Sequence, residues 1–298
     1  MCGLFGTIRP LRHSRSAGRT SAEAIHQLGI FAQERGVDSA GLAAFRQSPK
    51  NEVGKNGLSG HRGAARWTIT TGLGPYSAQL PSRPDLQAEL RTARIVLGHT
   101  RWATQGPPTL ANASPMEIGA IVGTHNGDVT APPDRDVDTD TAWLFGRLDR
   151  ARSLAEITFE LSALRGRAAL AWSSKSLPGL LFLARAALSP LVTAVDRHGA
   201  LWWGSNPEWL RQISISHRLD LSTPALMAEG EVVLLRSDVD RVTVADRARF
   251  IPTARPRDVW NADATCWRGF SSLDRELAAR RQNYRVDSSD AYTHALAG

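Results

Sequence analysis

The sequence is poor in cysteine, with only Cys2 and Cys266 among its 298 residues. Two cysteines this far apart do not build the disulfide framework that small secreted domains use. Neither belongs to a CxxC pair or to a cysteine–histidine cluster, so we expect neither a metal site nor a cofactor. Free cysteines at this low frequency fit a cytoplasmic location.

The sequence also lacks a run of about 18 apolar residues, which is the length that a membrane-spanning helix needs. The N-terminal segment contains no apolar stretch of the kind found in signal peptides, because arginines follow Phe5 at positions 9, 12, 15 and 19. We therefore expect no membrane span and no secretory signal.

Lysine is scarce as well, and arginine carries nearly all of the positive charge behind the net charge of +7. The arginines are spread along the chain instead of clustering in one stretch. This spread favours a codon bias of the genome over a nucleic-acid-binding surface. A nucleic-acid partner is therefore not indicated.

The length and the composition are those of a globular enzyme, with 42% hydrophobic and 22% charged residues. Apolar and alternating stretches predict many short strands, and apolar residues at helical spacing predict a few helices. This mixture favours an α+β layered domain. The expected strands are 3–9, 41–45, 66–71, 94–98, 118–123, 168–172, 180–184, 191–195, 200–203 and 231–235, and the expected helices are 20–34, 85–93, 140–148, 153–164 and 272–284.

Cys2 is the residue with the most chemistry to offer. If Met1 is removed, one residue carries both a thiol nucleophile and a free α-amine. The ordinary pKa of an α-amine is about 7.7–8.0, so near neutral pH it can accept a proton. Such a cysteine can therefore supply attack and proton transfer without a histidine.

Six clusters that follow in order give Cys2 its context. They are Cys2–Gly6, Arg35–Leu42, Gly98–Gly106, Asn112–Pro115, His125–Asp128 and Asp140–Thr141. The third, Gly-His-Thr-Arg-Trp-Ala-Thr-Gln-Gly, is the most specific. In this order the clusters resemble the class II glutamine amidotransferases, which are N-terminal nucleophile hydrolases. The likeness covers about residues 2–235 and is strongest to the glutaminase domains of glucosamine-6-phosphate synthase and amidophosphoribosyltransferase.

The resemblance implies a four-layer αββα sandwich and a glutaminase domain over residues 2–250, followed by a basic C-terminal extension over 251–298. It also implies hydrolysis of L-glutamine to glutamate and ammonia through a thioester on Cys2. By the same resemblance, the Asn126 side-chain amide and the Gly127 backbone N–H stabilise the oxyanion. Without the other clusters, Asn-Gly after a strand predicts an ordinary tight turn.

Four further residues are carried over as substrate-binding. Arg101 is expected to pair with the α-carboxylate of glutamine, because a guanidinium presents a two-pronged donor. Asp140 is expected to face the α-ammonium; an aspartate here is also expected as a helix N-cap, and both roles can hold at once. Trp102 and Thr104 are expected to belong to a loop that closes over glutamine, with core packing as the alternative for Trp102.

Arg35 is carried over as a supporting residue beside the nucleophile, acting either as structure or directly on Cys2. His99 and His125 are read as packed scaffold, because the family needs no histidine base. Three departures stand out: Gln105 and Ser114 occupy positions where close relatives often have histidine, and Ala142 follows Asp-Thr where glutamate is frequent.

About 60 residues follow the matched region, too few for a sugar isomerase or phosphoribosyltransferase domain. The sequence therefore predicts that the ammonia goes to a separate synthase subunit, for which the C-terminal extension offers a docking surface unless it packs back on the domain. Two other functions stay open at this point. One is a stand-alone γ-glutamyl amide hydrolase, and the other is a non-catalytic binding module of the same fold.

Overall fold

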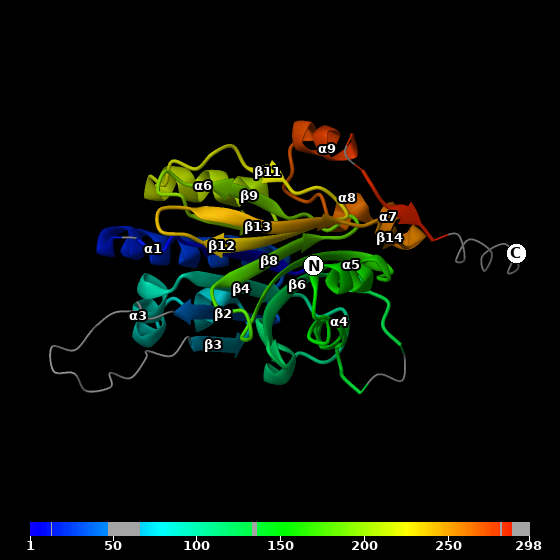
Figure 1. Cartoon of the computed structure of the whole chain (residues 1–298), viewed down its shortest axis with the longest axis horizontal. Helices are drawn as coiled ribbons and strands as arrows, with labels where there is room; N and C mark the ends of the chain where they lie inside the picture. The colour runs from blue at the N-terminus through cyan, green and yellow to red at the C-terminus, as the bar shows by residue number, and fades with distance from the viewer. Residues whose placement is uncertain (13, 47–65, 133–135, 281, 288–298) are drawn as a thin grey trace, which may run out of the picture.

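A computed structural model describes residues 1–12, 14–46, 66–132, 136–280 and 282–287. Two antiparallel sheets fill its centre (Figure 1). The first sheet contains, in spatial order, β11 (Ala225–Leu226), β9 (Val192–Val195), β10 (Leu201–Gly204), β1 (Gly3–Ile8), β4 (Ile95–Arg101), β2 (Ser39–Arg46) and β3 (Arg66–Leu73). The second contains β13 (Val242–Arg249), β12 (Glu231–Ser237), β8 (Leu180–Arg185), β7 (Gly166–Ser174), β6 (Ile121–Val129) and β5 (Met116–Ile118).

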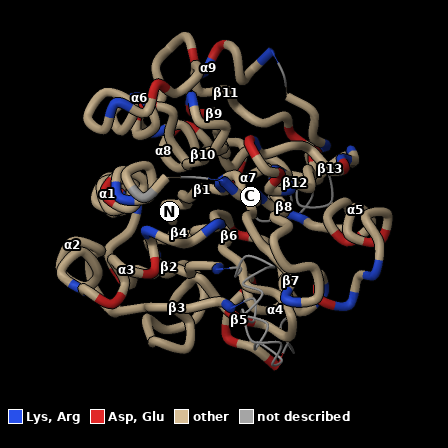
Figure 2. Tube along the Cα trace, turned by 60° about the vertical axis from the view of Figure 1, so that its left-hand side comes forward, with Lys and Arg blue, Asp and Glu red and all other residues tan. Residues whose placement is uncertain are grey.

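Helices cover the outer face of each sheet, and Figure 2 shows the strands in the middle with α1 and α2 on one side and α5 on the other. The helices on the first sheet are α1 (Arg15–Ala32), α2 (Tyr76–Gln79), α3 (Pro84–Thr92) and α6 (Pro207–His217). Those on the second are α4 (Asp140–Leu148) and α5 (Leu154–Ser162). Short 3₁₀ helices occupy Gln33–Arg35 and Leu110–Asn112.

The strands alternate between two cores along their length, as the two-residue period of a strand requires. In β4, Ile95 and Leu97 lie in the core between the sheets, whereas Val96 lies in the core under α1. A third core joins β6, β7 and β8 to α4 and α5. Three cores separate four layers, and this confirms the predicted α+β class and the αββα sandwich.

The strand expected over 118–123 has the wrong bounds, because β6 continues to Val129 and the Asn126-Gly127 step forms no turn. Both residues lie inside β6, which pairs with β7 without a break from Ile121 to Val129. The turn comes earlier, at Gly119, whose φ of 57° favours glycine. Long-range pairing with β7 therefore overrides the local turn signal of Asn-Gly.

The chain after residue 250 forms β14 (Thr253–Ala254), α7 (Pro256–Trp260), α8 (Ala262–Thr265), α9 (Ser272–Ala279) and β15 (Arg285–Val286). Cys266, Trp267 and Phe270 are buried in the core of the first sheet. Residue 281 and residues 288–298 of the expected extension lie outside the described part of the chain. The boundary at residue 250 stays a prediction.

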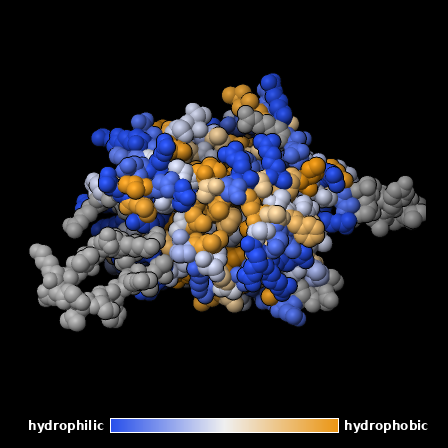
Figure 3. Space-filling model, viewed as in Figure 1, coloured by the Kyte–Doolittle hydropathy of each residue, from blue (hydrophilic) through white to orange (hydrophobic). Residues whose placement is uncertain are grey.

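The hairpin of β12 and β13 forms an exposed edge of the second sheet. On the face seen in Figure 3, apolar residues gather near the middle, where Figure 1 places these two strands. Val239 and Val244 are the large apolar residues of this hairpin that are exposed. Across the described ranges, no helix combines the length and the apolar character that crossing a bilayer requires.

Buried His26 makes the stability of the fold depend on pH. Burial lowers the pKa of His26 to about 4, whereas an unfolded histidine titrates near 6.5. Below pH 6.5 the unfolded chain therefore binds a proton that the folded chain does not, and the free energy of unfolding falls until about pH 4. We expect this one histidine to cost roughly 2 kcal/mol between pH 7.5 and pH 4.5.

The variant His26→Gln checks this expectation, because glutamine still offers Tyr76 Oη a hydrogen-bond partner in place of His26 Nδ1 and does not titrate. Urea unfolding at pH 7.5 and 4.5 should show a smaller acid loss in the variant. An equal loss in both proteins would show that His26 is not responsible.

Candidate active site

Strand register brings Cys2 and Arg101 together. β1 and β4 are antiparallel neighbours in which Gly3 pairs with Thr100. The residue before β1 therefore lies beside the last residue of β4. The Cys2 Sγ lies 3.7 Å from the Trp102 carbonyl oxygen, to which the thiol donates a weak hydrogen bond.

A small pocket opens at this point between the two sheets. Six of the predicted residues line it, namely Cys2, Arg101, Trp102, Thr104, Gly127 and Asp140. Its other lining residues are His99, Gln105, Asn112, Ser114, Met116, His125, Thr139 and Thr141. The cavity measures about 20 Å³, which is room for about one water molecule. An amino acid can enter only if the rim moves, and Trp102 at that rim is 53% exposed.

The loop after β4 is fixed by two charged side chains. Arg101 Nη1 donates to the Pro107 carbonyl (3.0 Å), and Nη2 donates to the Gln105 carbonyl (2.7 Å). Asp38 Oδ2 accepts from the Ala103 backbone N–H at 2.7 Å. Arg101 therefore has two tasks, because it faces the pocket and holds the loop that forms one wall.

Asp140 carries the negative charge of the pocket from the start of α4. Its neighbour Thr139 is the N-cap, whose side chain accepts from the Ala142 N–H. Asp140 is buried, and its Oδ2 accepts from the Val129 N–H at 3.0 Å. A carboxylate in the first turn is favoured by the helix dipole. The N-cap alternative for Asp140 is therefore wrong, since Thr139 is the cap, whereas Asp140 is the first residue of α4 and lines the pocket.

Asn126 and Gly127 lie side by side in β6. Asn126 is fully buried and does not line the cavity itself; its Nδ2 donates to Ser205 Oγ at 3.3 Å. Ser205 Oγ also accepts from the Leu4 N–H at 3.0 Å, which ties the second sheet to β1. A Cβ at Gly127 would collide with the backbone of Arg167, so only glycine fits there.

Two buried arginines surround the N-terminus. Arg35 lies outside the pocket lining, and its Nη2 donates to the Thr265 carbonyl at 3.1 Å and contacts Met1 Sδ at 3.6 Å. Burial lowers the pKa of the Met1 α-amine to about 6, against an opposing effect of Cys2, and the charges of Arg167 and Arg35 lower it further. The sequence gives no local signal for Arg167, which reaches the site through sheet pairing alone.

Burial also decides the ionisation of the thiol and of the nearby imidazoles. It raises the pKa of the Cys2 thiol, against smaller lowering effects of the bond to Trp102 and of the N-terminal charge. It lowers the pKa of His99 to about 3 and also lowers that of His125. At neutral pH the thiol is therefore protonated and needs a base, and both histidines are neutral. The two residues are linked by a hydrogen bond, because His99 Nε2 lies 3.0 Å from the His125 backbone carbonyl oxygen.

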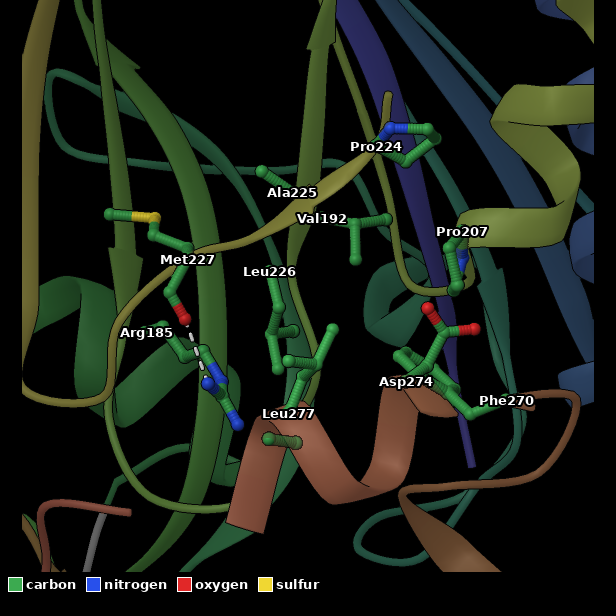
Figure 4. Close-up of a pocket in the computed structure, with 11 residues that line it drawn as sticks. Arg185, Val192, Pro207, Pro224, Ala225, Leu226, Met227, Phe270, Asp274 and Leu277 are labelled. Carbon is green, nitrogen blue, oxygen red and sulfur yellow. Dashed lines mark hydrogen bonds between the residues drawn. The ribbon is translucent and has the colours of Figure 1, made fainter. Parts of the chain in front are cut away.

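A second, larger cavity lies away from Cys2. Figure 4 shows it between α9 and the segment around Leu226, with a volume of about 200 Å³. Its walls are mainly apolar, and Arg185 at its edge donates to the Met227 carbonyl at 2.7 Å. Within the described ranges, no group of three or more His, Cys, Asp or Glu side chains is placed to hold a metal ion.

Comparisons with known proteins address the sequence and the fold of this chain. No protein-family model matches the sequence. The glutamine--fructose-6-phosphate aminotransferase of Mycolicibacterium smegmatis is 28% identical over 264 residues, which cover 82% of this chain and 37% of that protein. This chain therefore spans little more than a third of that relative's length.

Two solved structures share the fold. The glutamine phosphoribosylpyrophosphate amidotransferase of B. subtilis aligns with a TM-score of 0.54 and 16% identity, over 86% of this chain and 52% of its own. A structure described as the allosteric regulatory enzyme of purine biosynthesis aligns with a TM-score of 0.58 and 17% identity, over 86% and 51%. The chain is thus similar in sequence to a glutamine--fructose-6-phosphate aminotransferase and in fold to both solved structures, which confirms its resemblance to the class II glutamine amidotransferases.

Proposed function

We propose that this chain is a glutaminase that hydrolyses L-glutamine to glutamate and ammonia through a thioester on Cys2. The observation that carries the proposal is a single pocket lined by Cys2, Arg101 and Asp140. A thiol, a cation and an anion around one small space match the side-chain amide, the α-carboxylate and the α-ammonium of glutamine. Removal of Met1 is part of the proposal, because it frees the α-amine of Cys2.

In the proposed reaction the thiol attacks the side-chain carbonyl carbon of glutamine. The Cys2 α-amine takes the thiol proton and passes it to the leaving nitrogen. Ammonia leaves as the carbon–nitrogen bond breaks, and the γ-glutamyl group stays on sulphur. Water then attacks this thioester, with the amine as base, and releases glutamate and the free thiol.

The remaining predicted residues have parts in this scheme. The Asn126 amide has a second hydrogen beside the one that bonds Ser205, and it serves the oxyanion together with the Gly127 N–H. Trp102 and Thr104 move to admit glutamine and then exclude water. Arg35 supports the N-terminal segment from behind.

The assay is release of glutamate and ammonia from glutamine in equal amounts by the purified chain. Asparagine, which is one methylene shorter, serves as the control substrate and should react far more slowly. If glutamine is not hydrolysed but another γ-glutamyl amide is, the proposal of a glutaminase fails and the chain is an amide hydrolase of different specificity. No reaction with either class of amide would contradict catalysis altogether.

The pH profile of the reaction should report the α-amine. The Met1 amine has its pKa lowered to about 6 by burial beside Arg167 and Arg35, and the Cys2 amine enters the same surroundings. The amine must be neutral to act as a base, so kcat/KM should fall as the pH drops through its pKa. This pKa should lie below 7.7–8.0, the ordinary range for an α-amine. The variant Arg167→Gln should move this fall in kcat/KM to higher pH, because it removes a positive charge that lowers the pKa of the amine. A wild-type midpoint at or above 8 would contradict the account.

We further propose that the ammonia passes to a separate synthase in the cytoplasm. The relative named above supports this, because it is a glutamine--fructose-6-phosphate aminotransferase. A reducing compartment also keeps the Cys2 thiol free. Glutamine turnover that rises when a synthase encoded by a neighbouring gene is added to the purified chain would support the pairing.

A further inference from the structure

A chain of hydrogen bonds leads from the segment after residue 250 into the pocket wall. It starts at Arg255, which is 4% exposed and stands at the start of α7. Arg255 Nη2 donates to the Asp128 carbonyl at 2.7 Å, and the same nitrogen lies 2.9 Å from the Asp128 carboxylate. A second carboxylate, that of Asp258, accepts from Arg255 Nε at 2.7 Å. The guanidinium is thus held in one orientation between two elements.

Asp128 passes this contact on to the loop after β4. It follows Gly127 in β6, and its Oδ1 accepts from Gln105 Nε2 at 2.7 Å. The Gln105 carbonyl in turn accepts from Arg101 Nη2, and Gln105 lines the pocket. Although burial opposes it, the charge of Arg255 and the bond from Gln105 lower the pKa of Asp128. The ionised carboxylate is the stronger acceptor for the loop.

The same C-terminal segment reaches the back of the nucleophile. The Thr265 carbonyl accepts from Arg35, and Asp258 lies 3.8 Å from Arg167. Both arginines are buried near the N-terminus. The segment therefore contacts residues next to the pocket on two sides, namely Asp128 beside the loop and the two arginines near the N-terminus.

We infer that Arg255 is a positioning residue for the glutamine pocket, which it stabilises through Asp128 and Gln105. This inference rests on the proposed function, because it gives Arg255 a part in binding glutamine. Arg255 itself does not line the pocket. Its effect is to fix, through Gln105, the loop that Arg101 and Asp38 also hold.

The chain provides a matched control in Arg257. It lies two residues further on, and its Nη2 is 3.7 Å from the same Asp128 carboxylate. Its side chain is 65% exposed, whereas that of Arg255 is 5% exposed. An exposed pair at this distance contributes little, whereas loss of one partner from a buried pair leaves a carboxylate uncompensated.

The experiment compares Arg255→Met and Arg257→Met by two measurements. Hydrogen exchange of the backbone amides at 102–106, in the free protein, should become about tenfold faster in Arg255→Met and stay unchanged in Arg257→Met. Steady-state kinetics should show a KM for glutamine about tenfold higher in Arg255→Met, with kcat changed far less. Exchange and KM equal to those of Arg257→Met would overturn the inference, and so would faster exchange with an unchanged KM.

Gln105→Ala keeps the test decisive if Arg255→Met does not fold. It breaks the same series of hydrogen bonds but leaves no buried charge without a partner. It should raise KM in the same direction, and adding Arg255→Lys to it should raise KM no further. Independent, multiplying effects would mean that the two residues do not act in series and would overturn the inference. If the wild-type chain hydrolyses no glutamine, the proposed function fails, but the exchange rates still decide whether Arg255 fixes the loop.

Discussion

Replacing Cys2 with alanine should lower kcat for glutamine by a factor on the order of 10⁴ or more, because loss of a covalent nucleophile leaves only binding and oxyanion contacts. The fold should survive, since Cys2 precedes β1 and its side chain is only half-buried. Circular dichroism and thermal unfolding should match the wild type. The measurement is glutamate release at saturating glutamine.

Cys266→Ala is the matched control. Cys266 is fully buried in the core of the first sheet, and its removal should change stability slightly without removing glutamine hydrolysis. Retention of wild-type kcat by Cys2→Ala would end the thioester mechanism. Equal loss in both variants would show that the effect comes from folding and not from the nucleophile.

Replacing Arg101 with methionine should raise KM for glutamine on the order of 100-fold. Truncating one partner of a buried, hydrogen-bonded charge pair costs about 2–5 kcal/mol, and each 1.4 kcal/mol is tenfold. Part of this loss comes from the loop, because Arg101 bonds the carbonyls of Gln105, Gly106 and Pro107. Arg101→Lys should recover little, since an ammonium lacks the planar fork.

Arg83→Met controls for the removal of an arginine as such. Arg83 pairs with Asp85 on the surface, and its loss should leave KM as it is. The binding of glutamine by an inactive Cys2→Ala protein, measured by calorimetry, separates affinity from turnover. Binding by Cys2→Ala/Arg101→Met within twofold of that by Cys2→Ala would contradict the carboxylate role of Arg101.

Much of the fold follows from local pattern. The helix expected at 140–148 forms with those bounds, because its apolar residues Leu144, Phe145 and Leu148 face one core. By contrast, α1 begins at Arg15, capped by Ser14, five residues before the expected start, since the arginine-rich stretch lacks the apolar spacing that marks the rest. The helix α6 was not predicted, although Asn206-Pro207 carries a start signal.

The site likewise contains residues that local motifs predict and residues that only long-range contacts place there. Cys2, Arg101 and Asp140 lie within recognisable motifs, and the structure places all three on one pocket. Arg167 and Arg255 stand in no motif, and their roles depend on partners far away in the chain. Pairing of β6 with β7 brings Arg167 opposite Asp128, and the Arg255 contact with Asp128 spans 127 positions. No local pattern encodes such contacts.

Intact-mass spectrometry of the purified chain after treatment with the glutamine analogue diazo-oxo-norleucine tests the central claim most directly. The account predicts a protein that lacks Met1 and carries one adduct, located on Cys2 by peptide mapping and prevented by excess glutamine. A protein that retains Met1, or that takes up the reagent elsewhere or not at all, would contradict it.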